Sequence, residues 1–213
     1  MGENVSGIYS ILNRPAIFGA FHRLVVRRDA RRVLVDEYIR PNAGDRLLDI
    51  GCGPASMLPY LKDVNYTGLD LEENFIKQAT VKYGGRATFI HARIQDLSTK
   101  FDCEFDLAIT IGVVHHLDDG EAKELFRAVS KLLKPGGRLV VSDPVFRERQ
   151  NPLARMVMSF DRGKSIRTKE GYARLAGPEL ERVRTDVRSD FMRIPYDHCI
   201  SVYQKPGPTA STP

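Results

Sequence analysis

The residues with the clearest chemical meaning are one carboxylate and two glycines that follow an apolar run. Residues 47–50 are typical of a buried strand, which contains Asp49 and leads directly into Gly51 and Gly53. Glycine lets the backbone approach a ligand closely at the carboxyl end of a parallel strand, where open α/β sheets bind their ligands. The pattern therefore predicts a cofactor-binding loop.

Charge separates the two kinds of cofactor that such a loop binds. A dinucleotide pyrophosphate requires bare backbone and a third glycine, but here Asp49 stands before the loop and Ser56 occupies the third glycine position. The carboxylate would repel an anionic group. It would attract an ammonium or a sulfonium, and S-adenosylmethionine carries both.

Three further elements follow in order along the chain. Residues 66–70 are typical of the next strand, and Asp70 at its end has the spacing of about twenty residues at which such folds bind ribose hydroxyls. Residues 105–112 form an apolar run that leads into His115 and His116. Residues 132–143 combine a helix end, a Pro-Gly-Gly turn and another buried strand.

These four elements, in this order, resemble the class I S-adenosylmethionine-dependent methyltransferases over about residues 30 to 145. The Asp-x-Gly-Cys-Gly loop and the Leu-Lys-Pro-Gly-Gly turn are jointly specific, although neither is specific alone. The resemblance implies an α/β fold with a doubly wound, seven-stranded, mostly parallel sheet. It also implies an N-terminal helical lid, an antiparallel last strand, and a reaction that leaves S-adenosylhomocysteine.

The resemblance assigns cofactor roles to particular positions. It places Asp49, Gly51 and Gly53 around the methionine moiety and Asp70 at the ribose. The remaining positions that we expect at the cofactor are Leu71, Ile94, Gln95 and Tyr9.

Two positions depart from the family pattern. The third glycine of the family loop is Ala55, which adds one methyl group. The acid that often accepts the adenine amino group is replaced by Arg93, so Gln95 or Asp96 is left as the alternative acceptor. The sequence therefore leaves two alternative residues, Gln95 and Asp96, for the contact to adenine.

Methyl transfer depends mainly on the alignment of the acceptor atom with the methyl group. A general base helps when the acceptor is a hydroxyl. The candidate catalytic residues are His116, at the position where the family often has a histidine, His115 and Asp143. The alternative for both histidines is a packing role in their loop. We expect no metal, because the sequence has no compact cluster of acidic or Cys/His ligands.

The basic residues lie mainly outside the cofactor core. Residues 1–40 and 147–193 carry net positive charge, and residues 41–146 carry net negative charge. We expect a small, anionic acceptor, although surface arginines that merely cover the fold are the simpler explanation for any single one. The candidate substrate-binding residues are Arg162, Arg167, Arg193, Tyr196 and His198.

The 213 residues fit one α/β domain with additions. Its expected stretches are a helical lid at 1–40, the cofactor core at 41–146, a substrate cap with the closing β-hairpin at 147–204, and a disordered tail at 205–213. For most of the lid, a helix that only buries one face of the sheet is the alternative.

The sequence has neither an apolar run of membrane-spanning length nor a signal peptide at its start, so we expect a cytoplasmic monomer or homodimer. The function that these observations favour is methylation of an oxygen or nitrogen of a small acceptor, such as a secondary metabolite or a sugar-like compound. One alternative is an RNA methyltransferase that uses the basic flanks. Another is a catalytically silent protein that keeps the cofactor fold as a scaffold.

Overall fold

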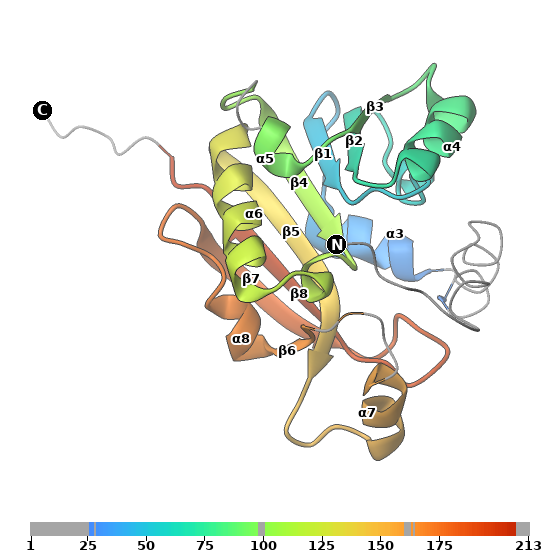
Figure 1. Ribbon diagram of the computed structural model, residues 1–213, viewed down its shortest axis with the longest axis vertical. Helices are drawn as coiled ribbons and strands as arrows, with labels where there is room; N and C mark the ends of the chain where they lie inside the picture. Colours follow the sequence, from blue (N-terminus) through green and yellow to red (C-terminus); the bar gives the residue numbers. More distant parts are fainter. Residues whose placement is uncertain (1–25, 28, 98–100, 160–162, 164, 208–213) are drawn as a thin grey trace, which may run out of the picture.

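The computed structural model describes residues 26–27, 29–97, 101–159, 163 and 165–207, and the account below concerns these residues. One mixed sheet runs through them in the order β3-β2-β1-β4-β5-β8-β7, with the short strand β6 beside β5 (Figure 1). The strands are β1 (Arg46–Ile50), β2 (Asn65–Asp70), β3 (Thr88–His91), β4 (Phe105–Ile111), β5 (Leu133–Phe146), β6 (Arg167–Thr168), β7 (Glu181–Arg188) and β8 (His198–Gln204).

The helices lie on both faces of this sheet. They are α3 (Ala30–Leu34), η1 (Val35–Ile39), η2 (Leu58–Tyr60), α4 (Glu73–Tyr83), α5 (Ile94–Leu97), η3 (Val114–His116), α6 (Asp119–Leu132), α7 (Pro152–Ser159) and α8 (Lys169–Ala173). Strands β1 to β5 are parallel neighbours, whereas β8 runs antiparallel to both β5 and β7. The predicted doubly wound sheet with an antiparallel last strand is confirmed.

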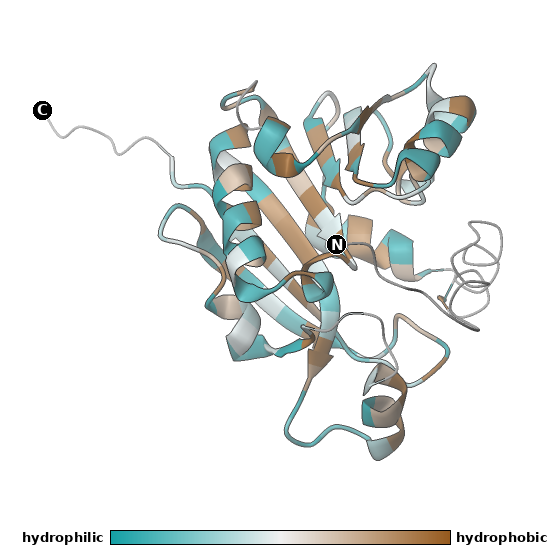
Figure 2. Cartoon of the chain, in the orientation of Figure 1, coloured by the Kyte–Doolittle hydropathy of each residue, from teal (hydrophilic) through white to brown (hydrophobic). Residues whose placement is uncertain are grey.

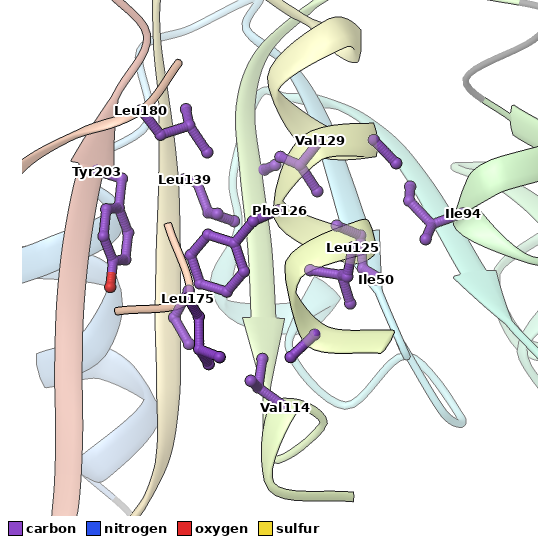
Figure 3. Close-up of a cluster of buried hydrophobic side chains, with 14 of the residues drawn as sticks. Ile50, Ile94, Val114, Leu125, Phe126, Val129, Leu139, Leu175, Leu180 and Tyr203 are labelled. Atoms are coloured by element: carbon purple, nitrogen blue, oxygen red, sulfur yellow. The ribbon is translucent and has the colours of Figure 1, made fainter. Parts of the chain in front are cut away.

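The face that carries α5 and α6 holds the first hydrophobic cluster. Helix α6 begins at a capping box in which Asp118 and Glu121 each accept the other's backbone N–H. Its apolar positions recur at helical spacing, so that Leu125, Phe126 and Val129 point into the sheet (Figure 3). Burying each such side chain contributes about 1.5–3 kcal/mol. This helix therefore fixes the position of the loop that precedes it.

The opposite face carries α3, η1 and α4 and holds the second cluster. Tyr38 of η1 is buried there and donates a hydrogen bond from its hydroxyl to Asp186 of β7 at 3.0 Å. The described end of the expected lid thus packs against this face of the sheet. Residues 1–25, which include Tyr9, lie outside the described residues, so the lid itself stays a prediction.

The parallel strands β1, β2, β4 and β5 all end at one edge of the sheet, which we call the carboxyl edge (Figure 1). Apolar residues concentrate on the strands, while the outward sides of the helices are polar (Figure 2). The chain before α3 reaches the segment that precedes β8, because Val26 bridges Met192 and Arg27 N–H donates to the Phe191 carbonyl at 3.0 Å. Strand order reverses between β1 and β4, the place where such sheets bind ligands.

Candidate active site

The glycine loop after β1 is folded back onto β2. The backbone N–H groups of Gly51 and Cys52 both donate to the Leu69 carbonyl, at 2.7 and 3.0 Å. Gly51 has φ +70°, and a Cβ on it would stand 2.4 Å from the Cγ2 of Val113 in the loop after β4. Both the positive φ and the lack of space for a Cβ therefore require glycine at this position. The same contact shows that the loops after β1 and β4 touch where the strand order reverses.

Ala55, which replaces the family's third glycine, adopts the same left-handed backbone. Its φ is +56°, and its methyl group is fully buried in the second cluster. This conformation costs a residue with a Cβ about 1–2 kcal/mol. The departure from the pattern thus leaves the path of the loop intact and adds strain to it.

Asp70 ties the glycine loop to the end of β2. Its carboxylate accepts the Gly53 N–H and the Glu72 N–H, each at 2.8 Å. A Cβ on Gly53 would meet nothing within 4 Å, so there is open space beside this part of the loop. Leu71 follows with 65% of its surface exposed, and its carbonyl oxygen lies 3.0 Å from the His91 ring. Asp70, the open space beside Gly53 and the exposed Leu71 therefore lie close together at the ends of β1 and β2.

Asp49 lies beneath this loop rather than in it. It is 3% exposed and accepts the hydroxyl of Tyr66 at 2.6 Å. Burial raises the pKa of Asp49 to about 7, and the hydrogen bond from Tyr66 opposes that rise. Tyr66 is a site residue that the sequence analysis missed, because a tyrosine inside a strand is by itself typical of core packing.

The residues expected at the adenine end separate in the structure. Ile94 begins α5 with its side chain buried in the first cluster, so its apolar surface is used by the core. Arg93 is exposed, and its backbone N–H points to the Asp96 carboxylate at 3.4 Å. Gln95 is half-buried on the same turn.

The loop after β4 and the end of β5 form a buried His–Asp pair. The Nδ1 of His115 lies 2.6 Å from the Oδ1 of Asp143, and the His115 backbone N–H donates to the same oxygen at 3.1 Å. The two residues are 5% and 1% exposed. Because a carboxylate accepts, the proton of this bond resides on Nδ1. Asp143 Oδ2 is buried and has no hydrogen-bond partner among the described residues.

The two histidines of η3 are not equivalent. His116 is exposed, and its ring centroid lies 4.0 Å from that of the buried His115, with 39° between the ring planes. His115 is therefore buried and hydrogen-bonded to Asp143, whereas His116 lies on the surface at the carboxyl edge. Of the two, His116 is the one placed to meet a molecule from solvent.

The candidate substrate-binding residues do not form one group. Arg167 is nearly buried and its guanidinium is bound to carbonyls and one carboxylate of the protein, so it is not presented to a ligand. Arg193 is exposed in the segment before β8. Arg162 lies outside the described residues.

The rings of Tyr196 and His198 are in tilted contact, with 5.2 Å between their centroids and 47° between their planes. In the antiparallel ladder His198 stands opposite Pro144, and Asp143 stands opposite Cys199. Because neighbouring residues of a strand alternate between faces, His198 lies on the α3 side of the sheet and the His–Asp pair on the α6 side. The sequence could not assign these faces without the strand register.

A buried carboxylate that the sequence analysis missed fixes the segment before β8. Asp197 is 3% exposed and accepts from Gln150 Nε2 at 3.0 Å and from the Ser189 hydroxyl. Arg147 pairs with the same carboxylate at 3.3 Å. This arrangement ties the start of the cap segment to the loop that carries Arg193.

Two features are absent from the described part of the chain. It contains no group of three or more His, Cys, Asp or Glu residues arranged to hold a metal ion. None of its helices is long and apolar enough to cross a membrane.

Comparison with known proteins gives one family and several relatives. A model of the methyltransferase domain matches residues 47–137. The chain is 31% identical over 138 residues to phosphoethanolamine N-methyltransferase 1 of Triticum aestivum, covering 62% of this chain and 27% of that one. It is 34% identical over 109 residues to 27-O-demethylrifamycin SV methyltransferase of Amycolatopsis mediterranei, covering 47% and 39%. The match thus spans well under half the length of either relative.

Solved structures share the fold at low identity. An S-adenosylmethionine-dependent methyltransferase of Methanosarcina mazei aligns with a TM-score of 0.68 at 21% identity, covering 82% of this chain and 97% of that one. The [4+2]-cyclase SpnF aligns with a TM-score of 0.68 at 19% identity, covering 83% and 81%. A Burkholderia thailandensis 1,6-didemethyltoxoflavin-N1-methyltransferase with bound S-adenosylhomocysteine aligns with a TM-score of 0.66 at 16% identity, covering 97% and 93%. Because the cyclase shares it, the fold alone does not determine the reaction.

Proposed function

We propose that this class I S-adenosylmethionine-dependent methyltransferase, whose residues 47–137 match the family model, methylates an oxygen or nitrogen of a small, anionic acceptor. One observation carries the proposal. The glycine loop after β1 touches the loop after β4, and the exposed His116 follows in the turn after that second loop. Donor and acceptor would then meet where the strand order reverses.

The residues around the glycine loop fit S-adenosylmethionine. Asp70 has the position and the carboxylate to accept ribose hydroxyls, and the open space at Gly53 leaves backbone accessible to the ligand. Leu71 offers an exposed apolar side chain to the adenine ring. When bound, S-adenosylmethionine supplies a methyl group on a sulfonium, which a nucleophile displaces in line. Where Asp49 is ionised, above about pH 7, its charge beneath the loop favours such a cationic ligand.

The chain's own part in the reaction is orientation and proton transfer. Alignment of acceptor and methyl group supplies much of the acceleration in such a displacement. His116 at the carboxyl edge would take the proton from a hydroxyl acceptor, whereas a neutral amine needs no strong base. His115 and Asp143 hold the turn that carries His116.

An anionic acceptor is supported by the basic residues of the cap segment. Arg149 and Arg193 are exposed on the two segments that Asp197 joins. Arginine is well suited to bind a carboxylate or phosphate through paired hydrogen bonds. The relative named for phosphoethanolamine, whose substrate carries a phosphate, agrees with this class of acceptor.

The first experiment is isothermal titration with S-adenosylmethionine and S-adenosylhomocysteine. We expect micromolar binding that Asp70→Ala abolishes and that Glu124→Ala leaves unchanged, because Glu124 lies on the outer side of α6. Transfer of labelled methyl groups is then measured on alcohols and amines that carry a phosphate or a carboxylate. A wild-type protein that binds neither compound would contradict the proposal.

Two other outcomes identify the alternatives. Cofactor binding without transfer to any acceptor would favour a silent scaffold. Methyl transfer to bulk tRNA, with binding that falls steeply as salt rises, would favour an RNA methyltransferase, because phosphate contacts are lost with salt.

A further inference from the structure

Arg167 occupies an unusual position for a residue in a basic surface segment. Its side chain is only 9% exposed, at the start of β6. The Nε donates to the Asp119 carboxylate at 2.9 Å, and Nη2 also reaches this carboxylate at 2.8 Å. The remaining bonds go to backbone carbonyls: Nη1 donates to Val114 at 3.1 Å and to Ser165 at 2.9 Å, and Nη2 to Leu117 at 2.8 Å. All five N–H donors of the guanidinium are therefore used.

Two of these carbonyls bracket the histidines. Val114 directly precedes His115, and Leu117 directly follows His116. One guanidinium thus joins both ends of the histidine turn and links them to the first turn of α6 through Asp119. No other residue type has a planar fork of five donors that can do this.

The segment just before Arg167 contacts the same turn independently. The Ser165 backbone N–H donates to the His115 carbonyl at 3.0 Å. Gly163 packs against the His115 ring so closely that a Cβ on it would stand 1.9 Å from Cδ2. Residues 163, 165 and 167 therefore all bear on the turn that carries the histidines.

We propose that Arg167 is the positioning residue of the histidine turn. By holding the carbonyls of Val114 and Leu117, it keeps His115 bonded to Asp143 and keeps His116 directed to the carboxyl edge. Its consequence for catalysis rests on the proposed function, whereas its effect on His115 does not. The arginine thus acts on the acceptor through the histidines and without touching it.

The test compares Arg167→Lys with Arg127→Lys, an exposed arginine on α6 that contacts neither histidine in the structure. Lysine keeps the charge but has three donors on one nitrogen, so it cannot span both carbonyls. In the cofactor-free protein, the Nδ1 proton of His115 should give a downfield resonance in proton NMR, because it is bonded to a carboxylate. We expect this resonance to shift or vanish in Arg167→Lys and to stay in Arg127→Lys.

The second measurement is the turnover of the two variants. We expect kcat to fall at least tenfold in Arg167→Lys, while KM for S-adenosylmethionine changes less than twofold, because the glycine loop is not in contact with the arginine. An unchanged resonance together with unchanged kcat would overturn the proposal. A wild-type protein that shows the resonance but no turnover would contradict the proposed function and leave the positioning role to be judged by NMR.

Gly163→Ala covers the case in which Arg167→Lys does not fold. Its methyl group would stand 1.9 Å from His115 Cδ2 and must displace the ring, and Gly163 is not held in the positive φ region that would strain an alanine. We expect it to alter the same resonance and to lower kcat with little change in KM for S-adenosylmethionine. A Gly163→Ala protein with wild-type resonance and kcat would refute the idea that this segment positions the histidines.

Discussion

At the scale of single residues, burial decides what each acid and each histidine of the site can do. Asp49 is separated from water and holds one phenolic hydrogen bond, so its pKa rises to about 7. The folded protein therefore binds a proton at Asp49 over a pH range in which the unfolded chain has lost it. Stability from this residue is complete below about pH 4 and is lost as pH rises through 7, by about 4 kcal/mol in all.

We expect Asp49→Asn to remove this pH dependence. The amide is neutral at every pH, so the variant should lose less stability than the wild type between pH 5 and pH 8. The same change removes the negative charge that Asp49 carries above about pH 7, so at pH 8 it should weaken binding of S-adenosylmethionine more than binding of S-adenosylhomocysteine, whose sulfur is uncharged. Urea unfolding at the two pH values and titration with both ligands measure this. Equal pH dependence in the two proteins would contradict the assignment.

The two histidines should respond oppositely to truncation. His116→Ala should lower kcat for a hydroxyl acceptor by about 100- to 10,000-fold, the usual contribution of a general base, without loss of stability. His115→Ala should destabilise the fold by about 2–3 kcal/mol, because it leaves the buried Asp143 carboxylate without its partner. Denaturant unfolding and turnover, measured on both variants, separate the roles. A stable His115→Ala protein beside an unstable His116→Ala protein would reverse them.

At the scale of elements, the glycine loop shows how two neighbouring glycines serve different ends. Gly51 is constrained by its positive φ and by Val113, whereas Gly53 is constrained by its φ alone and borders open space. The Gly-x-Gly motif in the sequence identified the positions of both residues. Only the packed loops reveal that the first glycine serves the contact between β1 and β4.

Alanine substitution should therefore rank the two glycines by stability. Gly51→Ala should lower the melting temperature more than Gly53→Ala, because it adds a clash of 2.4 Å to the backbone strain that both share. Gly53→Ala should keep more of its stability yet lose cofactor affinity, since its methyl group enters the open space. Thermal unfolding and titration test the order. Equal melting temperatures would show that Val113 moves aside at no cost.

At the scale of the whole molecule, the sheet order collects the site from distant parts of the chain. Asp49, Asp70, His115 and Asp143 belong to different strands or loops, and the parallel ladder β2-β1-β4-β5 brings their ends to one edge. The segment before β8 and the chain before α3 meet near the same edge, through Val26 and Met192. Ligand binding should therefore stabilise the fold as a unit.

We expect S-adenosylhomocysteine at about one hundred times its dissociation constant to raise the free energy of unfolding by about 2.7 kcal/mol. For a chain of this size that corresponds to a rise in melting temperature of several degrees, at about 2–4 °C per kcal/mol. Differential scanning calorimetry measures the shift, with Asp70→Ala as the control that should show none. A wild-type melting temperature that does not change with S-adenosylhomocysteine would contradict the proposal that the protein binds this ligand.

The sequence by itself determined the fold class and the cofactor loop. Short apolar runs, glycines before a helix and a Pro-Gly-Gly turn are signals within a few neighbouring residues, so they can be interpreted without the rest of the chain. The expected roles of Gly51, Gly53 and Asp70 rest on such local signals. In the structure Asp70 accepts the Gly53 N–H, and Gly51 packs against Val113, while their roles at the cofactor stay predictions.

Only the tertiary structure decided which polar residues are partners. The pairs Asp49–Tyr66 and His115–Asp143 join separate strands, and their geometry depends on register and on which face each residue occupies. Arg167 looked like a substrate clamp by charge, but its partners are mainly carbonyl oxygens, which every residue carries and no sequence pattern marks. Long-range packing, which buries the arginine against those oxygens, therefore gave it a positioning role that its residue type alone did not indicate.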